Sequence, residues 1–158
     1  MTEILTELRK TNGINEMLNR IQETRSSDEA LAKRVIGVAM KVHRTLGCGF
    51  IESVYANALV LELRKTEIFF EQEKVYPVFY DNVEIGVFHA DLVIENRLIV
   101  ELKSVEALNI AHSVQLVNYL AAAKIDFGLL LNFGAKSLDF KTKSRIYYSQ
   151  EEPPFLHS

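Results

Sequence analysis

Apolar side chains recur three or four positions apart between residues 3 and 25, which predicts one or two short amphipathic helices interrupted at Gly13. Two roles fit the apolar face of this N-terminal extension, residues 1–25. It could cover the core of the protein, which we favour, or it could form a dimer contact. Ser26 and Glu29 have the spacing of a capping box, so we expect a separate helix to begin there.

Two helices are expected between this extension and the first strand. The first carries a single apolar stripe and ends at Gly47 and Gly49, and the second begins near Phe50. The residues expected to face the core are Leu31, Val35, Val38, Val42 and Leu46 in the first helix, and Ile51, Val54, Ala58 and Leu61 in the second.

From Ile68 onward the chain becomes β-branched and aromatic, a composition typical of strands. Residues 68–80, 83–95 and 98–105 predict an antiparallel meander, with turns at Asp81-Asn82 and near Asn96. Residues 109–125 are apolar on most sides, so we expect a helix that is largely buried. A short covered strand over 127–133, a last strand over 138–148 and a loose tail over 149–158 complete the prediction.

The order of these elements, α-α-β-β-β-α-β, predicts an α/β fold in which helices flank a small mixed β-sheet. The 158 residues suit one domain, and 48% hydrophobic with 25% charged residues is ordinary for a globular protein. We expect no secretory signal and no membrane segment, and the single Cys48 favours a cytoplasmic location. A net charge of −3 argues against a surface coated in positive charge, so nucleic acid would need a local basic patch or bound cations.

Charged side chains interrupt the apolar stretch from His89 to Val105, where buried strands are expected. Glu101 and Lys103 share one face of their strand, and the turn near Asn96 can bring Asp91 of the preceding strand close to both. Converging carboxylates repel one another, and a hard divalent cation such as Mg²⁺ relieves that repulsion. The same residues would also suit the solvated face of an edge strand, where a Glu–Lys pair contributes about 0–1 kcal/mol.

An Asp on one strand followed by Glu-x-Lys on the next resembles the PD-(D/E)XK nuclease superfamily. GFIESVY, residues 49–55, matches the G-x-x-E-x-x-Y signature of the GxxExxY proteins, a branch of that superfamily. The flanking segments VHRTLG, HSVQLVNYL and GLLLNFG follow in the same order, and the resemblance runs from about residue 30 to 148. It implies a restriction-endonuclease-like core, and we assign residues 26–148 to this nuclease-like domain.

The resemblance implies roles for the charged residues. Asp91 and Glu101 become ligands of Mg²⁺ or Mn²⁺, with the Leu102 backbone carbonyl as a third. Lys103 becomes the residue that positions the attacking water, and Glu52 an additional acidic group that binds the metal through water or acts as a general base. An exposed carboxylate near a helix N-terminus is the plain alternative for Glu52.

Further residues are candidates for positioning or for substrate contact. Gln115 and Tyr119 resemble a Gln-x-x-x-Tyr element whose amide helps organise the site, and they share a helix face with His112. Tyr55 either packs or contacts substrate. His89 stands where many members of the family have Arg, which bears on substrate binding. Lys143 and Arg145, in a basic cluster with Lys136 and Lys141, could contact phosphates or form a solvated strand face.

Two functions follow from these observations. We expect a divalent-metal-dependent nuclease that hydrolyses nucleic-acid phosphodiester bonds, DNA or RNA, by attack of metal-activated water. The alternative is a catalytically weak binding or regulatory module that keeps the nuclease fold and acts with a protein partner. The acidic net charge of the chain motivates this second interpretation, as does His89 at the position where many members of the family have Arg.

Overall fold

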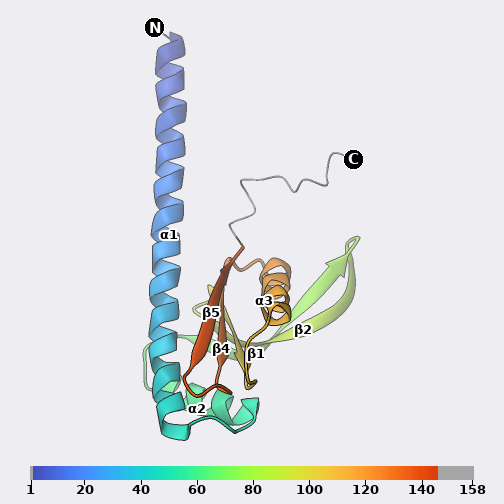
Figure 1. Ribbon diagram of the computed structural model, residues 1–158. Helices are drawn as coiled ribbons and strands as arrows, with labels where there is room; N and C mark the ends of the chain where they lie inside the picture. The colour runs from blue at the N-terminus through green and yellow to red at the C-terminus, as the bar shows by residue number, and fades with distance from the viewer. Residues whose placement is uncertain (1, 146–158) are drawn as a thin grey trace.

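The computed structural model describes residues 2–145 and contains a five-stranded mixed sheet with helices on both faces (Figure 1). The predicted tail, residues 149–158, and the end of the last predicted strand lie outside the described residues. The elements are α1 (Thr2–Leu46), α2 (Glu52–Arg64), β1 (Phe70–Tyr80), β2 (Val83–Ile94), β3 (Leu98–Lys103), α3 (Ile110–Ala123), β4 (Phe127–Asn132) and β5 (Asp139–Ser144).

The sheet order is β1-β2-β3-β4-β5, with β3 and β4 parallel and the other neighbours antiparallel. The helix α3 makes the crossover between the parallel strands. Two apolar clusters fill the spaces on the two faces of the sheet. One joins α1 and α2 to the sheet through residues such as Val35, Leu59 and Val100, and the other joins α3 to it through Leu116 and Leu130. The predicted mixed α/β sheet flanked by helices is confirmed.

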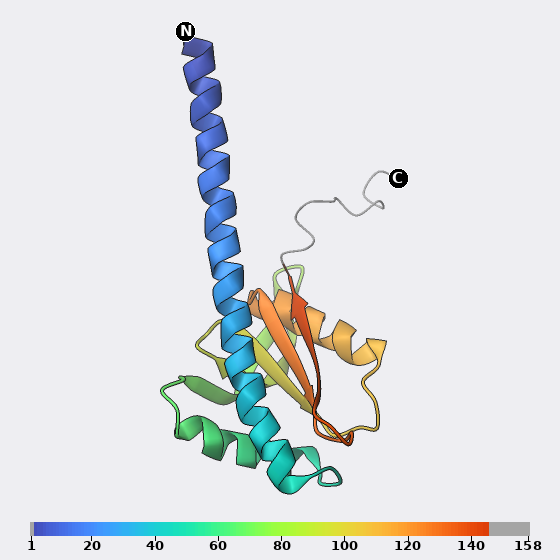
Figure 2. The same ribbon diagram turned by 60° about the vertical axis from the view of Figure 1, so that its left-hand side comes forward.

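The helix α1 is one continuous helix of 45 residues, which corrects the predicted break before residue 26 (Figures 1 and 2). Gly13 lies inside it, because a single glycine costs only about 1 kcal/mol relative to alanine in a helix. Ser26 and Glu29 also lie inside it, and the side chains of Arg25 and Glu29 form an i,i+4 ion pair across the expected boundary. A capping box acts only where the chain enters a helix, and here the chain is already helical.

Residues 2–24 of α1 are exposed, so the preferred role of this extension as cover for the core is wrong. Ile4 remains 67% exposed and Leu18 46% exposed. Figure 2 shows this part of α1 extending well past the end of the sheet. Contact with the core begins at Asp28, which is buried and forms an ion pair with Arg97.

Two helices differ from their predictions in what they bury: α2 buries another face than expected, and α3, expected to be largely buried, is not. In α2 the buried residues are Tyr55, Leu59, Val60 and Leu63, whereas Ile51 and Leu61 are 71% and 59% exposed. The α2 sequence has apolar residues on more than one side, so spacing alone did not select the stripe that packs. In α3 only Leu116 and Leu120 are buried, because this helix lies as an outer layer on one face of the sheet.

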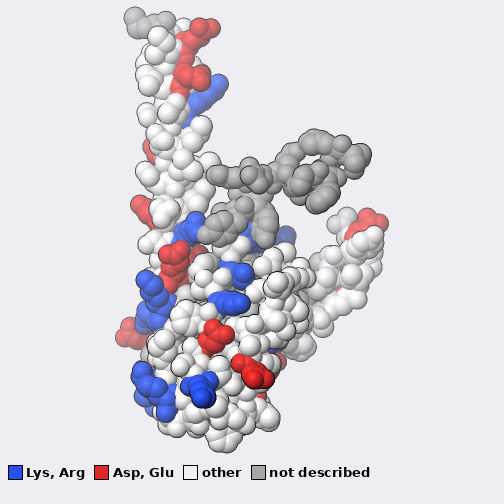
Figure 3. Space-filling model, viewed as in Figure 1, with Lys and Arg blue, Asp and Glu red and all other residues white. Residues whose placement is uncertain are grey.

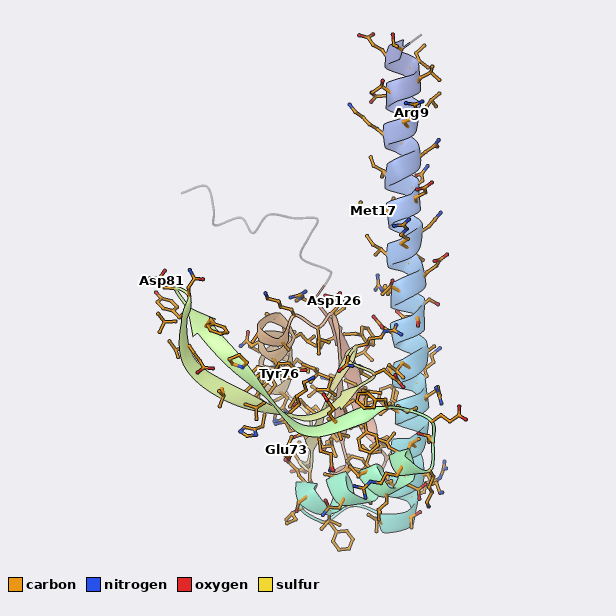
Figure 4. All side chains as sticks on the ribbon, turned by 180° about the vertical axis from the view of Figure 1, so that it is seen from behind. Arg9, Met17, Glu73, Tyr76, Asp81 and Asp126 are labelled. Carbon is orange, nitrogen blue, oxygen red and sulfur yellow. The ribbon has the colours of Figure 1, made fainter. Side chains whose placement is uncertain are left out.

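The hairpin formed by β1 and β2 extends far beyond the sheet. β1 and β2 pair along their whole length, from Phe70 opposite Ile94 to Tyr80 opposite Val83. In contrast, β2 pairs with β3 only between Leu92 and Ile94. The remainder of the hairpin curves away, with Asp81 at its tip (Figure 4). The predicted turn at Asp81-Asn82 is confirmed, and both residues have positive φ, of 50° and 58°. Although α1 is long, no helix within residues 2–145 is apolar enough to cross a membrane.

Candidate active site

The candidate site lies where β2 separates from β3. The last paired residues before the separation are Leu92 and Val100, so Asp91 and Glu101 come next on the two strands. The Asp91 Oδ2 atom accepts a hydrogen bond from the Leu102 N–H at 2.8 Å, and the Asp91 N–H donates to Glu101 Oε1 at 3.2 Å. These two hydrogen bonds join the strands beyond their last paired residues and hold the two carboxyl groups close to each other.

Glu101 is the most strongly perturbed acid of the site. Glu101 is only 5% exposed. Burial, and after it the negative charge of Asp91, raise the pKa of Glu101 to about 8, although the hydrogen bond from the Asp91 N–H and the charge of Lys103 partly oppose the increase. A buried carboxyl beside another carboxylate is stabilised by a cation, and oxygen ligands of this kind suit Mg²⁺ or Mn²⁺. The residues present therefore fit a divalent metal ion.

The side chain of Lys103 reaches across to α3. Its Nζ atom donates a hydrogen bond to Gln115 Oε1 at 3.3 Å. The Tyr119 ring stacks on Phe88 with 4.0 Å between ring centroids. Burial raises the pKa of Tyr119, and the charges of Glu101 and Asp91 raise it further, which places its hydroxyl within their field. The structure therefore brings Gln115 to Lys103 and Tyr119 near the two carboxyl groups, while their helix neighbour His112 closes the capping box of α3.

Glu52 approaches the site from α2 but does not join the carboxylate pair. It is the first residue of α2 and lines a cavity of about 610 Å³ together with Asp91, Leu102 and Glu73. Within residues 2–145, no group of three or more His, Cys, Asp or Glu side chains is arranged to hold a metal ion. The predicted role of Glu52, contact with the metal ion through water or action as a general base, is compatible with its position across the cavity and stays a prediction.

Tyr55 is a packing residue, so the structure favours the first of its two predicted roles, packing or substrate contact. It is fully buried and stacks on Phe133 with 4.6 Å between centroids. Its hydroxyl donates to the Gly47 carbonyl at 2.6 Å and accepts from the Phe50 N–H at 3.2 Å. Both bonds fix the loop before α2. The Ser104 hydroxyl also donates to the Phe50 carbonyl, at 2.7 Å, and so ties this loop to the end of β3.

The remaining predicted contacts lie at different distances from the site along the strands. His89 is exposed on the hairpin, two residues before Asp91. Lys143 pairs with Gly128 at the start of β4, toward the opposite end of the sheet from Lys103, and lines a separate cavity of about 680 Å³ between α3 and β5. Arg145 is held by Asp126, with 3.0 Å between its Nη2 atom and Oδ1. The structure does not bring Lys143 and Arg145 to the carboxylate pair.

Asn132 is a positioning residue that sequence reasoning missed. It is fully buried at the end of β4, opposite Lys103 in the parallel ladder. Its Oδ1 atom accepts hydrogen bonds from the Val105 and Gly134 N–H groups, both at 3.0 Å. The amide thereby fixes the segment that follows Lys103. A single amide within the apolar run FGLLLNF was the signal that could have identified it.

A mixed sheet with Asp91 at a strand separation, and with Glu101 and Lys103 on the next strand, defines a nuclease-type domain of the restriction-endonuclease-like fold. The family model of the PD-(D/E)XK nuclease superfamily matches residues 29–145. The chain belongs to this superfamily, and the predicted restriction-endonuclease-like core is confirmed.

Comparison with individual proteins adds little to this assignment. No curated protein matches the chain. Among solved structures, the chain is similar to the crystal structure of SSO0001, with 18% sequence identity and a TM-score of 0.45. The similarity covers 59% of this chain and 50% of that chain, so the chain spans about half the length of SSO0001.

Proposed function

We propose that this protein is a divalent-metal-dependent nuclease that hydrolyses phosphodiester bonds of DNA or RNA, with Mg²⁺ or Mn²⁺ as its cofactor. The observation that supports this most is the buried Glu101 carboxyl, which lies beside Asp91. The pKa of Glu101 is raised to about 8. The Glu101 carboxyl becomes anionic beside Asp91 only at a cost unless a cation accompanies it. A bound divalent ion would polarise a phosphoryl oxygen and supply the attacking water.

Each residue of the site has a role in this proposal. Asp91 and Glu101 hold the metal ion, together with the Leu102 carbonyl. Lys103 stabilises the negative charge that develops on the phosphate, and the Gln115 carbonyl oxygen, 3.3 Å from its ammonium, keeps that ammonium in place. Glu52 serves as a water-mediated contact or a general base from across the cavity.

The signature GFIESVY supports placing the chain in the GxxExxY branch of the superfamily. Two residues of the signature have different positions in the structure. Tyr55 lies in the core and fixes the loop before α2, whereas Glu52 is the first residue of α2 and lines the cavity. The tyrosine of the signature therefore has a structural role without contact to substrate. The cytoplasmic location and the preferred polymer stay predictions.

Cleavage of labelled single-stranded DNA, duplex DNA and RNA in Mg²⁺ or Mn²⁺ tests the proposal. We expect wild type to cleave at least one polymer and Asp91→Asn and Lys103→Met to lose roughly 100-fold or more. Glu84→Gln and Lys33→Met remove the same charges at exposed positions and are the matched controls, with activity unchanged. Equal cleavage by the site variants and wild type would remove Asp91 and Lys103 from the mechanism.

A specific observation also favours the second function, a regulatory module of low turnover. The net charge is −3, and Arg145 of the basic C-terminal cluster is already paired with Asp126. If wild type binds Mn²⁺ at the Asp91–Glu101 pair but cleaves none of the polymers, this second function replaces the first. A protein partner would then be expected to supply contacts to the nucleic acid.

A further inference from the structure

The exposed part of α1, residues 2–24, is called the projecting segment here. Its apolar side chains include Ile14, Leu18 and Ile21, which follow one another at steps of four and three. Continued along α1, the same steps lead to Ala32 and Val35, which are buried against the sheet. The face of α1 that packs on the core therefore continues past the end of the sheet, where nothing within the described residues covers it.

A free helix of this kind is expected to have a partner. In proteins, a helix gains most of its stability from the packing of its apolar face, and nothing within the described residues packs on this one. Ile4, Leu8, Met17 and Leu18 are between 46% and 67% exposed, and the sticks in Figure 4 show Met17 projecting from α1 with no neighbouring element. An exposed apolar stripe along a helix that leaves its own domain marks an interaction surface.

The charges along the projecting segment indicate which partner fits. Glu3 and Glu7 lie in its first half with Arg9 and Lys10, and the second half carries Glu16, Arg20 and Glu23; Figure 3 shows the acidic residues nearest the N-terminus and basic residues just below them. If two copies paired in parallel, each charge would meet its own kind. If they pair in opposite directions about a centre near Gly13, Arg9 and Lys10 meet Glu16 and Glu7 meets Arg20, whereas Glu3 meets Glu23, so contacts between opposite charges outnumber those between like charges.

We propose that the projecting segment binds a second copy of itself, as an antiparallel helix pair with its two-fold axis near Gly13. This arrangement sets the apolar first turns, Ile4 to Leu8, against Met17 to Ile21 of the other copy. Gly13 has no side chain and no heavy atom within 4 Å of a Cβ position, so the two backbones can approach closely at the axis. The interface is isologous, as in most protein dimers.

The length of the projecting segment fits this pairing. With the axis near Gly13, the first residues of one helix lie beside residues 23 and 24 of the other. Those residues immediately precede Arg25, where exposure decreases, and Asp28, where contact with the core begins. Over residues 2–24, the two helices can therefore pair without meeting the sheets. At 1.5 Å per residue, the two Asp28 positions stand about 45 Å apart, with one nuclease domain at each end.

Sedimentation velocity of the full chain, over about 1–100 μM, tests the pairing. We expect wild type to be dimeric, and we expect Leu18→Lys to raise the dimer Kd roughly 100-fold. Leu61→Lys, at an exposed apolar position on α2, is the matched control and leaves the dimer intact. Circular dichroism establishes that each variant stays folded. A wild type that remains monomeric at 100 μM overturns the proposal.

Charge reversal tests the direction of the pair. Glu16→Lys is expected to raise the dimer Kd about tenfold, and adding Arg9→Glu and Lys10→Glu is expected to restore it. In a Cys48→Ser background, Ile4→Cys should form a disulfide with Ile21→Cys when the two chains are mixed. Disulfides between identical positions, with no restoration by the charge exchange, would mean parallel pairing and would overturn the antiparallel arrangement.

Discussion

Replacing Glu101 with glutamine is expected to stabilise the metal-free protein above neutral pH, although it removes a residue of the candidate site. Glutamine has nearly the shape of the protonated acid. Its carbonyl can accept the Asp91 N–H, as Glu101 Oε1 does at 3.2 Å, and its amide can donate to the Asp91 carboxylate. The substitution therefore keeps the hydrogen bonding and removes only the buried negative charge.

The magnitude follows from the raised pKa of Glu101, which moves from 4.5 to about 8 on folding. Because the folded state binds the proton of Glu101 more tightly, the contribution of Glu101 to the free energy of unfolding falls as pH rises between these two values. It is constant below the lower value and above the higher one. At about 1.4 kcal/mol per pKa unit, the ceiling is about 4–5 kcal/mol, reached above pH 8. Water entry and relaxation reduce this, and we expect on the order of 2–4 kcal/mol.

Urea unfolding of wild type and Glu101→Gln in EDTA, from pH 5 to pH 9, measures this difference. The free energy of unfolding of Glu101→Gln should exceed that of wild type by an amount that grows with pH. Other titrating groups contribute equally to both proteins and cancel. Glu84→Gln, at an exposed position on the hairpin, should show no such trend. A difference that stays flat within about 0.5 kcal/mol across this range would refute the reasoning, because Glu101 would then ionise as it does in the unfolded chain.

Three further predictions concern the surroundings of the pair. Tyr55→Phe loses the hydrogen bonds that fix the loop before α2 and should lower the free energy of unfolding by about 1–2 kcal/mol, whereas Tyr80→Phe, at an exposed position, should not change it. Gly134→Ala places a Cβ 2.3 Å from a backbone oxygen and should cost more than about 2 kcal/mol by urea unfolding, in contrast to Gly86→Ala, which meets open space. Gln115→Ala should lower kcat about tenfold in the cleavage assay and leave the Kd for Mn²⁺ unchanged in calorimetry, and an altered Kd with normal kcat would contradict its role toward Lys103.

The sheet and the carboxylate pair could be predicted because both depend on local pattern. The turns at Asp81-Asn82 and near Asn96 fix how the strands meet, and two-residue alternation then brings Asp91 toward Glu101. Alternation does not predict how Asp91 is held, however. The pairing of β2 with β3 ends beside Asp91, and its carboxylate accepts a hydrogen bond from the Leu102 N–H.

The helices were harder to predict, since their boundaries and buried faces depend on what packs against them. The pattern around Ser26 and Glu29 resembles a helix start, yet nothing in the sequence states that the preceding residues are already helical. In α2, two apolar stripes compete, and the sheet selects the one containing Leu59. Tyr55 illustrates the same limit for function, because a motif identifies the residue without stating whether it faces substrate or core.

Calorimetric titration of Mn²⁺ into wild type and Glu101→Gln at pH 8 tests the central claim most directly. We expect wild type to bind the ion at the Asp91–Glu101 pair. We expect Glu101→Gln to raise the Kd for Mn²⁺ at least about 100-fold while remaining folded. Equal affinity of the two proteins for Mn²⁺ would contradict this claim, because the buried pair would then not be the metal site.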